Sequence, residues 1–213
     1  MGISERKERE KQELRSKILE AANKMLAKEG YEKTSLRKIA KEVEYSVGTI
    51  YLYFKNKDEL FFAIHEEGFN LLYEKLAPAM EIKNPVDRLH NLGERYLQFA
   101  FDHPDYYDLM FMQRGPMNFI EGELDPCRGE ENAAKWAAVR RSFGCLYQTV
   151  QDLIEQDKLK TNDVNLTSFF IWSTMHGMTA LSICKRLENI YPENHIPDLM
   201  SETMQLLQKS ILK

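Results

Sequence analysis

Residues 34–60 read TSLRKIAKEVEYSVGTIYLYFKNKDEL, and this stretch decides the fold. Thr34 and Ser35 are residue types that cap helix N-termini. Behind them apolar residues recur at i, i+3, i+4 and i+7, at Leu36, Ile39, Ala40 and Val43. After Ser46 the same spacing returns on an expected inward face, at Val47, Ile50, Tyr51 and Phe54. The pattern predicts two short helices joined by a tight turn, over about residues 35–54.

The expected outer face of the second helix has the chemistry of a DNA reader. Thr49 offers a hydroxyl to phosphates or base edges, Gly48 lets a backbone come close, and Tyr53 can reach a phosphate. Leu52 is apolar there, and packing explains it better than contact with a thymine methyl. Any small three-helix domain yields such stripes, so the spacing alone leaves DNA binding and a purely structural role both open.

Upstream, residues 11–29 carry a helical apolar stripe that includes Leu14, Ile18 and Ala22, and Gly30 follows as a C-cap glycine. Charge separates this part from the rest. Residues 1–57 hold 14 Lys/Arg and 9 Asp/Glu, net +5, and residues 58–213 are net −9. The basic segment suits a polyanion, since phosphate contacts supply most non-specific nucleic-acid affinity. The alternative is that these Lys-rich helices are merely solvated.

The run from Thr34 to Ala40, followed by Ser46 to Leu60, closely resembles the DNA-binding domain of TetR-family transcriptional regulators. With Ile18, Ala22 and Gly30 the likeness covers about residues 12–72. It implies a homodimeric, repressor-type regulator whose third helix reads an operator half-site. Glu44 departs from the pattern, because the family usually has glycine in that turn. If the backbone has a positive φ there, a side chain costs roughly 1 kcal/mol.

We therefore expect double-stranded operator DNA as a partner. The predicted DNA-binding residues are Thr34, Ser35, Arg37, Tyr45, Ser46, Val47, Gly48, Thr49, Tyr53, Lys55 and Lys57.

The remainder of the chain is predicted to be helical. Helices are expected over about 58–77, 84–102, 106–112, 131–156, 165–187 and 197–212, with a mobile loop over 113–130. No segment alternates as a strand would. The fold class is all-α, with about nine helices: a three-helix helix-turn-helix domain followed by a larger bundle. We assign residues 1–11 to a charged arm, 12–72 to the DNA-binding domain, and 73–213 to a ligand-binding and dimerisation domain.

Aromatic and methionine side chains on facing stripes of the bundle suggest a pocket for a small, hydrophobic effector. The predicted ligand-binding residues are Phe69, Leu72, Phe99, Tyr106, Met110, Phe111, Phe143, Tyr147, Trp172, Met175 and His176. The alternative for each of them is ordinary core packing.

The last two helices are the candidates for self-association, because the segment 165–187 is apolar around most of its circumference. TetR-family proteins dimerise through their last two helices, and Trp172, His176 and Gly177 are similar to a signature in some of their C-terminal domains. The predicted dimer residues are Ser173, Gly177, Ala180, Leu181, Cys184, Leu199, Met200, Met204, Leu207 and Ile211. The alternative is an internal core helix.

Other classes of function find little support. The three cysteines have no C-x-x-C spacing and the five histidines have no i, i+4 partner, so we expect no metal and no cofactor. No catalytic motif occurs. The uncharged stretch 164–184 contains nine polar or glycine residues and is interpreted as a buried helix, not a membrane span. We expect a cytoplasmic regulator. Two alternatives stay open: a DNA-binding protein whose bundle binds another protein, and an all-α enzyme.

Overall fold

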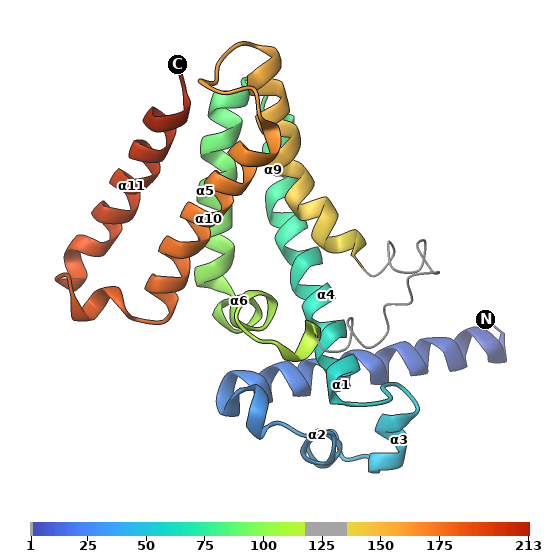
Figure 1. Cartoon of the computed structure of the whole chain (residues 1–213). Coiled ribbons are helices and arrows are strands. Elements are labelled where there is room, and N and C mark those ends of the chain that lie inside the picture. The colour runs from blue at the N-terminus through green and yellow to red at the C-terminus, as the bar shows by residue number, and fades with distance from the viewer. Residues whose placement is uncertain (1, 118–135) are drawn as a thin grey trace. The chain divides into compact units, whose positions relative to one another are not determined.

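The computed structural model describes residues 2–117 and 136–213 of the chain (Figure 1). Within them the chain is helical, and its one β-type contact is a bridge between Leu159 and Leu212. The all-α class predicted from the sequence is confirmed. Two compact units are present: an N-terminal unit of residues 1–69 and 105–135, and a C-terminal unit of residues 70–104 and 136–213. The predicted loop 113–130 lies largely outside the described residues.

The N-terminal unit begins with α1 (Ile3–Lys33), which is interrupted where Gly30 takes a φ of 77°. It continues with α2 (Leu36–Glu42), α3 (Val47–Tyr51) and α4 (Lys57–Leu76), whose last turns belong to the other unit. The sequence predicted that the first helix would begin near residue 11, and this was wrong. Exposed pairs four residues apart, such as Arg6 with Glu10, favour helix where apolar periodicity is absent.

The core of this unit is built from the inward faces of its helices. Ile18 of α1, Ile39 of α2, Ile50 of α3 and Ile64 of α4 are all fully buried. Leu109 of α6 (Pro104–Phe111) joins the same cluster and is also fully buried. The helix after Pro104 therefore contributes to the core of the N-terminal unit, although it lies far from α1 in the sequence.

The C-terminal unit contains a short 3₁₀ turn, η1 (Ala77–Glu81), and four long helices. These are α5 (Pro85–Asp102), α9 (Ala137–Glu155), α10 (Val164–Ile183) and α11 (Ile196–Ile211). Two further 3₁₀ turns, η2 (Leu187–Asn189) and η3 (Glu193–His195), connect the last two helices. Asn84 caps α5 through its side chain, with Pro85 at the first helical position, as the sequence predicted. Helix α5 packs against both α9 and α10.

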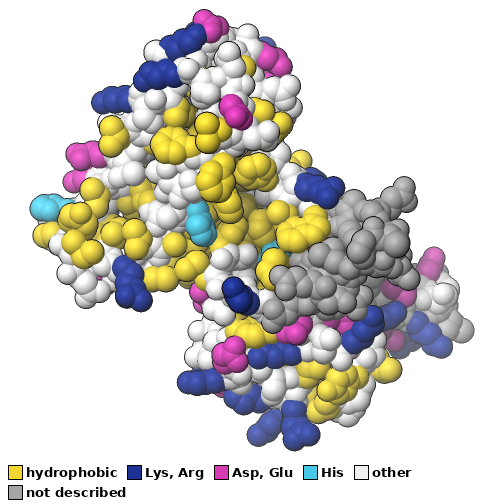
Figure 2. All heavy atoms as spheres, in the orientation of Figure 1, with side chains coloured by type: hydrophobic (Ala, Val, Ile, Leu, Met, Phe, Trp, Pro, Cys, Tyr) yellow, Lys and Arg dark blue, Asp and Glu magenta, His cyan; other side chains and the backbone are white. Residues whose placement is uncertain are grey.

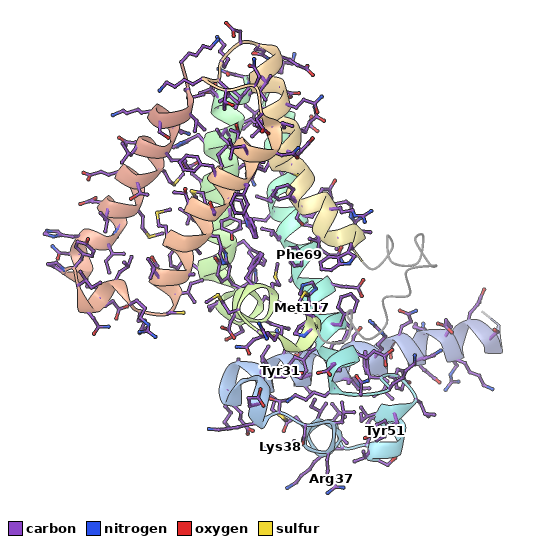
Figure 3. The ribbon with its side chains drawn as sticks, in the orientation of Figure 1. Tyr31, Arg37, Lys38, Tyr51, Phe69 and Met117 are labelled. Atoms are coloured by element: carbon purple, nitrogen blue, oxygen red, sulfur yellow. The ribbon has the colours of Figure 1, made fainter. Side chains whose placement is uncertain are left out.

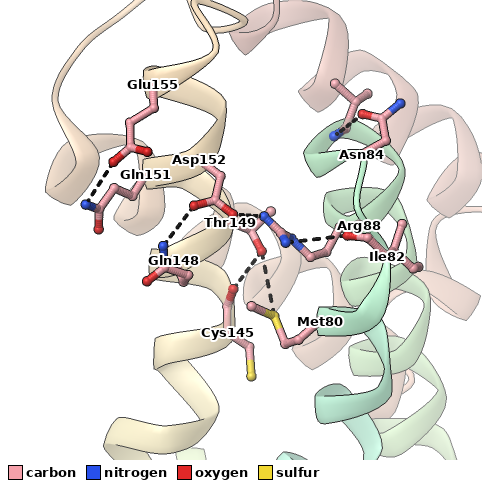
Figure 4. Close-up of polar contacts among 11 residues, drawn as sticks. Met80, Ile82, Asn84, Arg88, Cys145, Gln148, Thr149, Gln151, Asp152 and Glu155 are labelled. Carbon is pink, nitrogen blue, oxygen red and sulfur yellow. Dashed lines mark hydrogen bonds and ion pairs between the residues drawn. The ribbon is translucent and has the colours of Figure 1, made fainter.

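A buried ion pair ties α5 to α9 (Figure 4). The Arg88 guanidinium donates to the Asp152 carboxylate, and it also reaches the Ile82 carbonyl at 3.4 Å. Only 8% of the Arg88 side chain and 26% of the Asp152 side chain are exposed. Gln148 donates its amide to the other oxygen of Asp152 at 2.8 Å. Because water screens this pair poorly, its geometry matters more than that of a surface pair.

We expect Asp152→Ala to lower the free energy of unfolding by about 3 kcal/mol, because it leaves the Arg88 charge buried without its partner. Urea denaturation followed by circular dichroism measures this. The control is Glu155→Ala on the same helix, which removes an exposed carboxylate and should cost no more than about 0.5 kcal/mol. The double change Arg88→Met with Asp152→Leu should recover most of the loss. A double variant as unstable as Asp152→Ala would show that burial of an unpaired charge is not the cause.

Candidate nucleic-acid interface

The turn between α2 and α3 fixes the direction of the third helix. The Tyr45 amide donates to the Ala40 carbonyl at 2.9 Å, and the Glu44 amide donates to the Lys41 carbonyl at 3.2 Å. These are the two hydrogen bonds of a Schellman motif, which requires a left-handed residue just after the helix. Glu44 is that residue, with a φ of 60°. The positive φ considered from the sequence is therefore present, and the residue that adopts it is not glycine.

Helix α3 begins at a serine cap. The Ser46 side chain accepts a hydrogen bond from the Thr49 amide at 3.0 Å, and its oxygen lies 2.9 Å from the Thr49 hydroxyl. Ser35 caps α2 in the same way by accepting from the Lys38 amide. Both hydroxyls are at the surface, but each already has a partner within the chain.

The surface of α2 and α3 carries basic, aromatic and small residues together. Arg37 is exposed on α2, and Tyr45 in the turn is 46% exposed. On and after α3, Tyr51 is 55% and Leu52 is 80% exposed, and Gly48 is also exposed. Figure 3 shows Arg37 and Tyr51 on the side of this unit that faces away from α1. This surface is the candidate nucleic-acid interface.

The sequence placed Tyr51 inside and Tyr53 outside, and this was wrong. Tyr53 is half-buried and packs against the core, whereas Tyr51 is exposed. Helical spacing continues past α3, since the Phe54 amide donates to the Ile50 carbonyl and Phe54 is 2% exposed. At about 100° per residue, Tyr51 and Tyr53 flank this inward face on opposite sides, so the spacing does not decide which of the two is covered. Tyr51 is the residue that sequence reasoning missed.

Other predicted DNA-binding side chains are engaged inside the unit. Thr34 is 2% exposed, and its hydroxyl donates to the Gly30 carbonyl at 2.9 Å. Val47 packs against the core. The Lys57 ammonium lies 3.9 Å from the centre of the Tyr31 ring, and burial lowers the pKa of this lysine. Lys55 is exposed. Their roles in DNA binding stay predictions.

Tyr31 links three segments of the N-terminal unit. Its hydroxyl donates to the Asp58 carboxylate at the start of α4, and burial raises its pKa. Gly115 lies against the same ring: a Cβ placed there would be 2.0 Å from the Tyr31 Cζ atom. Only a residue without a side chain fits at position 115 while the ring keeps this place. Neither residue was predicted from the sequence.

The predicted ligand residues are divided between the two units. In the N-terminal unit, Phe69 and Phe111 have ring centres 5.4 Å apart, and Met110 lies against Gly68. His65, which the sequence analysis did not select, has its ring centre 4.8 Å from that of Phe69. It is 2% exposed and its Nδ1 atom has no hydrogen-bond partner. Burial lowers the pKa of His65 to about 4, so this histidine is neutral at pH 7. Tyr106 is half-buried in this unit, and burial raises its pKa to about 12.

In the C-terminal unit a second aromatic cluster surrounds Trp172. Its ring centre lies 6.2 Å from that of Phe143 and 5.6 Å from that of His176. The Tyr96 hydroxyl lies 3.3 Å from His176 Nδ1, and burial lowers the pKa of His176. The other members assigned to this unit are Leu72, Phe99, Tyr147 and Met175. Leu72, Phe99 and Met175 are buried, so core packing accounts for them without a ligand.

Helix α10 carries an exposed apolar stripe. Leu166, Phe169, Phe170 and Leu181 are 45–60% exposed, and they share a helix face with Ser173, Gly177, Ala180 and Cys184. Figure 2 shows hydrophobic side chains gathered over α10 and α11 on the face in view. The eight α10 residues named above, Leu166, Phe169, Phe170, Ser173, Gly177, Ala180, Leu181 and Cys184, are called the α10 stripe. The sequence predicted the five C-terminal members as dimer residues and missed Leu166, Phe169 and Phe170.

The α11 assignments differ from the sequence prediction. Met200, Met204, Leu207 and Ile211 are buried within the C-terminal unit, so a single chain already covers them. Leu199 is half-buried, and Leu206, which was not selected, is 68% exposed. The reason is that a helix with apolar residues on two faces does not reveal from its sequence which face packs internally.

Within residues 2–117 and 136–213, no three His, Cys, Asp or Glu side chains lie close enough together to hold a metal ion. Among the described helices, none combines the length and the hydropathy that a bilayer span needs.

Comparison with known proteins gives two family matches. Residues 18–64 match the family described as bacterial regulatory proteins, tetR family, and residues 89–204 match the family described as tetracyclin repressor-like, C-terminal domain. An uncharacterized HTH-type transcriptional regulator of Haemophilus influenzae is 28% identical over 162 residues, covering 74% of this chain and 83% of that protein.

Two solved structures share the fold. FadR of Bacillus subtilis in complex with stearoyl-CoA superposes with a TM-score of 0.67 at 20% identity, covering 90% of this chain and 96% of that one. AibR in complex with isovaleryl coenzyme A and operator DNA superposes with a TM-score of 0.60 at 22% identity, covering 78% and 85%.

The strain at Glu44 is testable. Replacing Glu44 with Gly should raise the free energy of unfolding by about 0.5 kcal/mol. The change removes a left-handed Cβ penalty of about 1–2 kcal/mol from the folded state. Against this, glycine gives the unfolded chain more conformational entropy, which lowers the stability by about 0.4–1 kcal/mol. Chemical denaturation measures the change. The control, Glu44→Ala, keeps the Cβ and should give no gain. Equal stabilisation by Gly and Ala would attribute the effect to loss of the glutamate charge instead of to the backbone.

Proposed function

This chain belongs to the TetR family of bacterial transcriptional regulators, and from that premise we propose that it is a cytoplasmic repressor. It binds a palindromic operator as a homodimer and leaves the DNA when a small hydrophobic effector binds. Helix α3 would lie in the major groove, with α2 crossing the backbone. Exposed Arg37 and Tyr51, with half-buried Thr49 between them in the sequence, support this, because phosphate contacts position a reader and hydroxyl groups can read base edges.

The proposal rests mainly on Gly48, an exposed glycine that the fold itself does not require. A Cβ at this position would meet only the Ser46 oxygen, at an ordinary 3.6 Å, and the backbone needs no positive φ there. The chain therefore does not need glycine for its own packing, and glycine weakens a helix by about 0.8–1.0 kcal/mol relative to alanine. Close approach of an external backbone, such as a DNA strand, gives this exposed glycine a use.

We expect Gly48→Ala to leave the protein as stable as before, or slightly more stable, and to weaken operator binding about tenfold or more. The operator is obtained by selection from a random duplex library, and gel-shift titration measures affinity against an unrelated duplex. The selected site should be palindromic and bound about a thousandfold more tightly than that duplex.

The matched control is Gly144→Ala on α9, where a Cβ would meet nothing within 4 Å. It should keep full operator affinity. Thr49→Ala and Tyr51→Ala should weaken specific binding while the fold is kept. If Gly48→Ala, Thr49→Ala and Tyr51→Ala all bind the operator as the parent does, α3 is not the recognition helix.

We propose that the α10 stripe, together with Leu206 and Leu199 of α11, is the dimer interface. Large apolar side chains that are 45–68% exposed lie on both helices, and a contiguous patch of this kind marks an association site. Gly177 supports the assignment, since no atom of the chain lies within 4 Å of where its Cβ would be. A second helix could therefore approach closely at this position.

Leu206→Glu and Phe169→Glu should convert the dimer to a monomer in analytical ultracentrifugation, because each places a charge in an apolar interface. Gln205→Glu is the matched control: the neighbouring residue of the same helix receives the same charge, and the protein should stay a dimer. Full dimerisation of both stripe variants would place the interface elsewhere.

For the effector we propose a hydrophobic acyl compound, such as an acyl-coenzyme A. The support is that two proteins of the same fold were solved with stearoyl-CoA and isovaleryl coenzyme A. The aromatic clusters around Phe69 and Trp172 offer apolar surface of the right kind. An effector releases the operator only if it binds the DNA-free conformation more tightly.

Gel shifts with the selected operator and a series of acyl-coenzyme A chain lengths test the effector assignment. Release by at least one thioester, with coenzyme A alone as the inactive control, is the expected result. Retention of the operator with every thioester would reject the acyl assignment. It would favour the alternative in which the C-terminal bundle responds to a protein.

A further inference from the structure

A groove of about 500 Å³ opens in the C-terminal unit between α5, α10, η2, η3 and α11. None of the eleven predicted ligand residues lines it. Its volume falls within the range of about 300–1,000 Å³ that small-molecule sites occupy. The groove is therefore a separate candidate site.

The floor of the groove is apolar and adaptable. Leu97 and Phe101 of α5 line it from one side, and Met200 and Met204 of α11 line it from the other. Phe101 is 50% exposed although it is a large apolar residue. The tip of Met204 rests over Gly93, where a Cβ would be 2.9 Å from the methionine methyl carbon. Methionine side chains reshape easily, so this floor can fit ligands of differing outline.

The rim of the groove is acidic. Glu94 of α5, Glu188 of η2 and Glu193 of η3 all line it, and the described residues that line it include no lysine or arginine. His90 of α5 lines the groove as well. Its Nε2 lies 3.4 Å from the Glu94 carboxylate and its Nδ1 lies 3.2 Å from the Gln208 amide. A cleft with walls of one charge sign and an apolar floor concentrates ligands of the opposite sign.

We propose that this groove binds an organic cation with an apolar body. The apolar body would rest on Phe101, Met200 and Met204, and the positive charge would lie at the rim among Glu94, Glu188 and Glu193. The charge complementarity selects this occupant over an acyl-coenzyme A, whose phosphates the three carboxylates would repel. The proposal does not rest on the proposed operator or acyl effector, because it concerns different residues.

Dimerisation through the α10 stripe would leave the groove open. Successive residues of a helix are about 100° apart, so on α11 the groove residues Pro197, Ser201 and Met204 share one face. Leu199 and Leu206 share the face roughly opposite. A partner helix packed on that second face would not cover the groove.

Tetraphenylphosphonium is the probe, and tetraphenylborate is its control of nearly the same shape and opposite charge. The chain carries ten methionines, and ¹³C-methyl methionine spectra report on each of them. The Met200 and Met204 signals, assigned with Met→Leu variants, follow the groove itself. These signals distinguish binding in the groove from binding of an anion to the basic segment 1–57. Tetraphenylphosphonium should shift both signals saturably, at least about tenfold more tightly than tetraphenylborate does.

Combined Glu94→Gln and Glu193→Gln substitution should weaken tetraphenylphosphonium binding about tenfold, because each exposed pair contributes a few-fold. Glu202→Gln removes an exposed α11 carboxylate that does not line the groove, and it should leave binding unchanged. Three results would overturn the proposal: no saturable shift of Met200 and Met204, equal binding of the two probes at these signals, or undiminished binding in the double variant. Operator binding is measured separately, so failure here is distinct from failure of the repressor assignment.

Discussion

Burial of Ile39 and Ile50 is the constraint on which the helix-turn-helix formed by α2 and α3 depends. Helix α2 has seven residues and α3 has five, and helices this short do not persist alone in water. They exist here because each turns one isoleucine, fully buried, into the cluster formed by α1 and α4. The serine caps and the Schellman turn then satisfy the backbone groups at the helix ends. The position of the exposed surface of α3 is therefore fixed by residues that are themselves buried.

This arrangement explains how far the sequence could predict the fold. The class, the helix starts at Asn84 and Ser46, and the break at Gly30 followed from caps and apolar spacing, because these signals are local. The start of α1 did not, since ion pairs such as Arg6 with Glu10 replace apolar periodicity there. A positive φ at Glu44 could be considered from the sequence, but the two backbone hydrogen bonds of the turn could not be predicted from it.

The site was harder to predict residue by residue than the fold. Tyr51 and Tyr53 exchange places because they flank the inward face of Ile50 and Phe54 on opposite sides, and no spacing rule states which flank the neighbouring helices cover. Thr34 is a good cap residue by type, yet its hydroxyl is used on the Gly30 carbonyl inside the unit. The apolar residues of α11 divide between an internal and an external face. Only the packing of α5 and α10 decides which face is which.

The partners of two lysines bear on how DNA binding responds to salt. Lys38 is held by the Glu29 carboxylate, and Lys57 lies on the Tyr31 ring, so each must give up a contact before it neutralises a phosphate. The logarithm of DNA affinity falls with the logarithm of salt by about 0.9 for each phosphate neutralised. Salt also weakens the pairing of Lys38, which partly offsets the loss. We therefore expect a salt dependence shallower than the +5 charge of residues 1–57 implies, with uncharged contacts from α3 carrying more of the proposed binding.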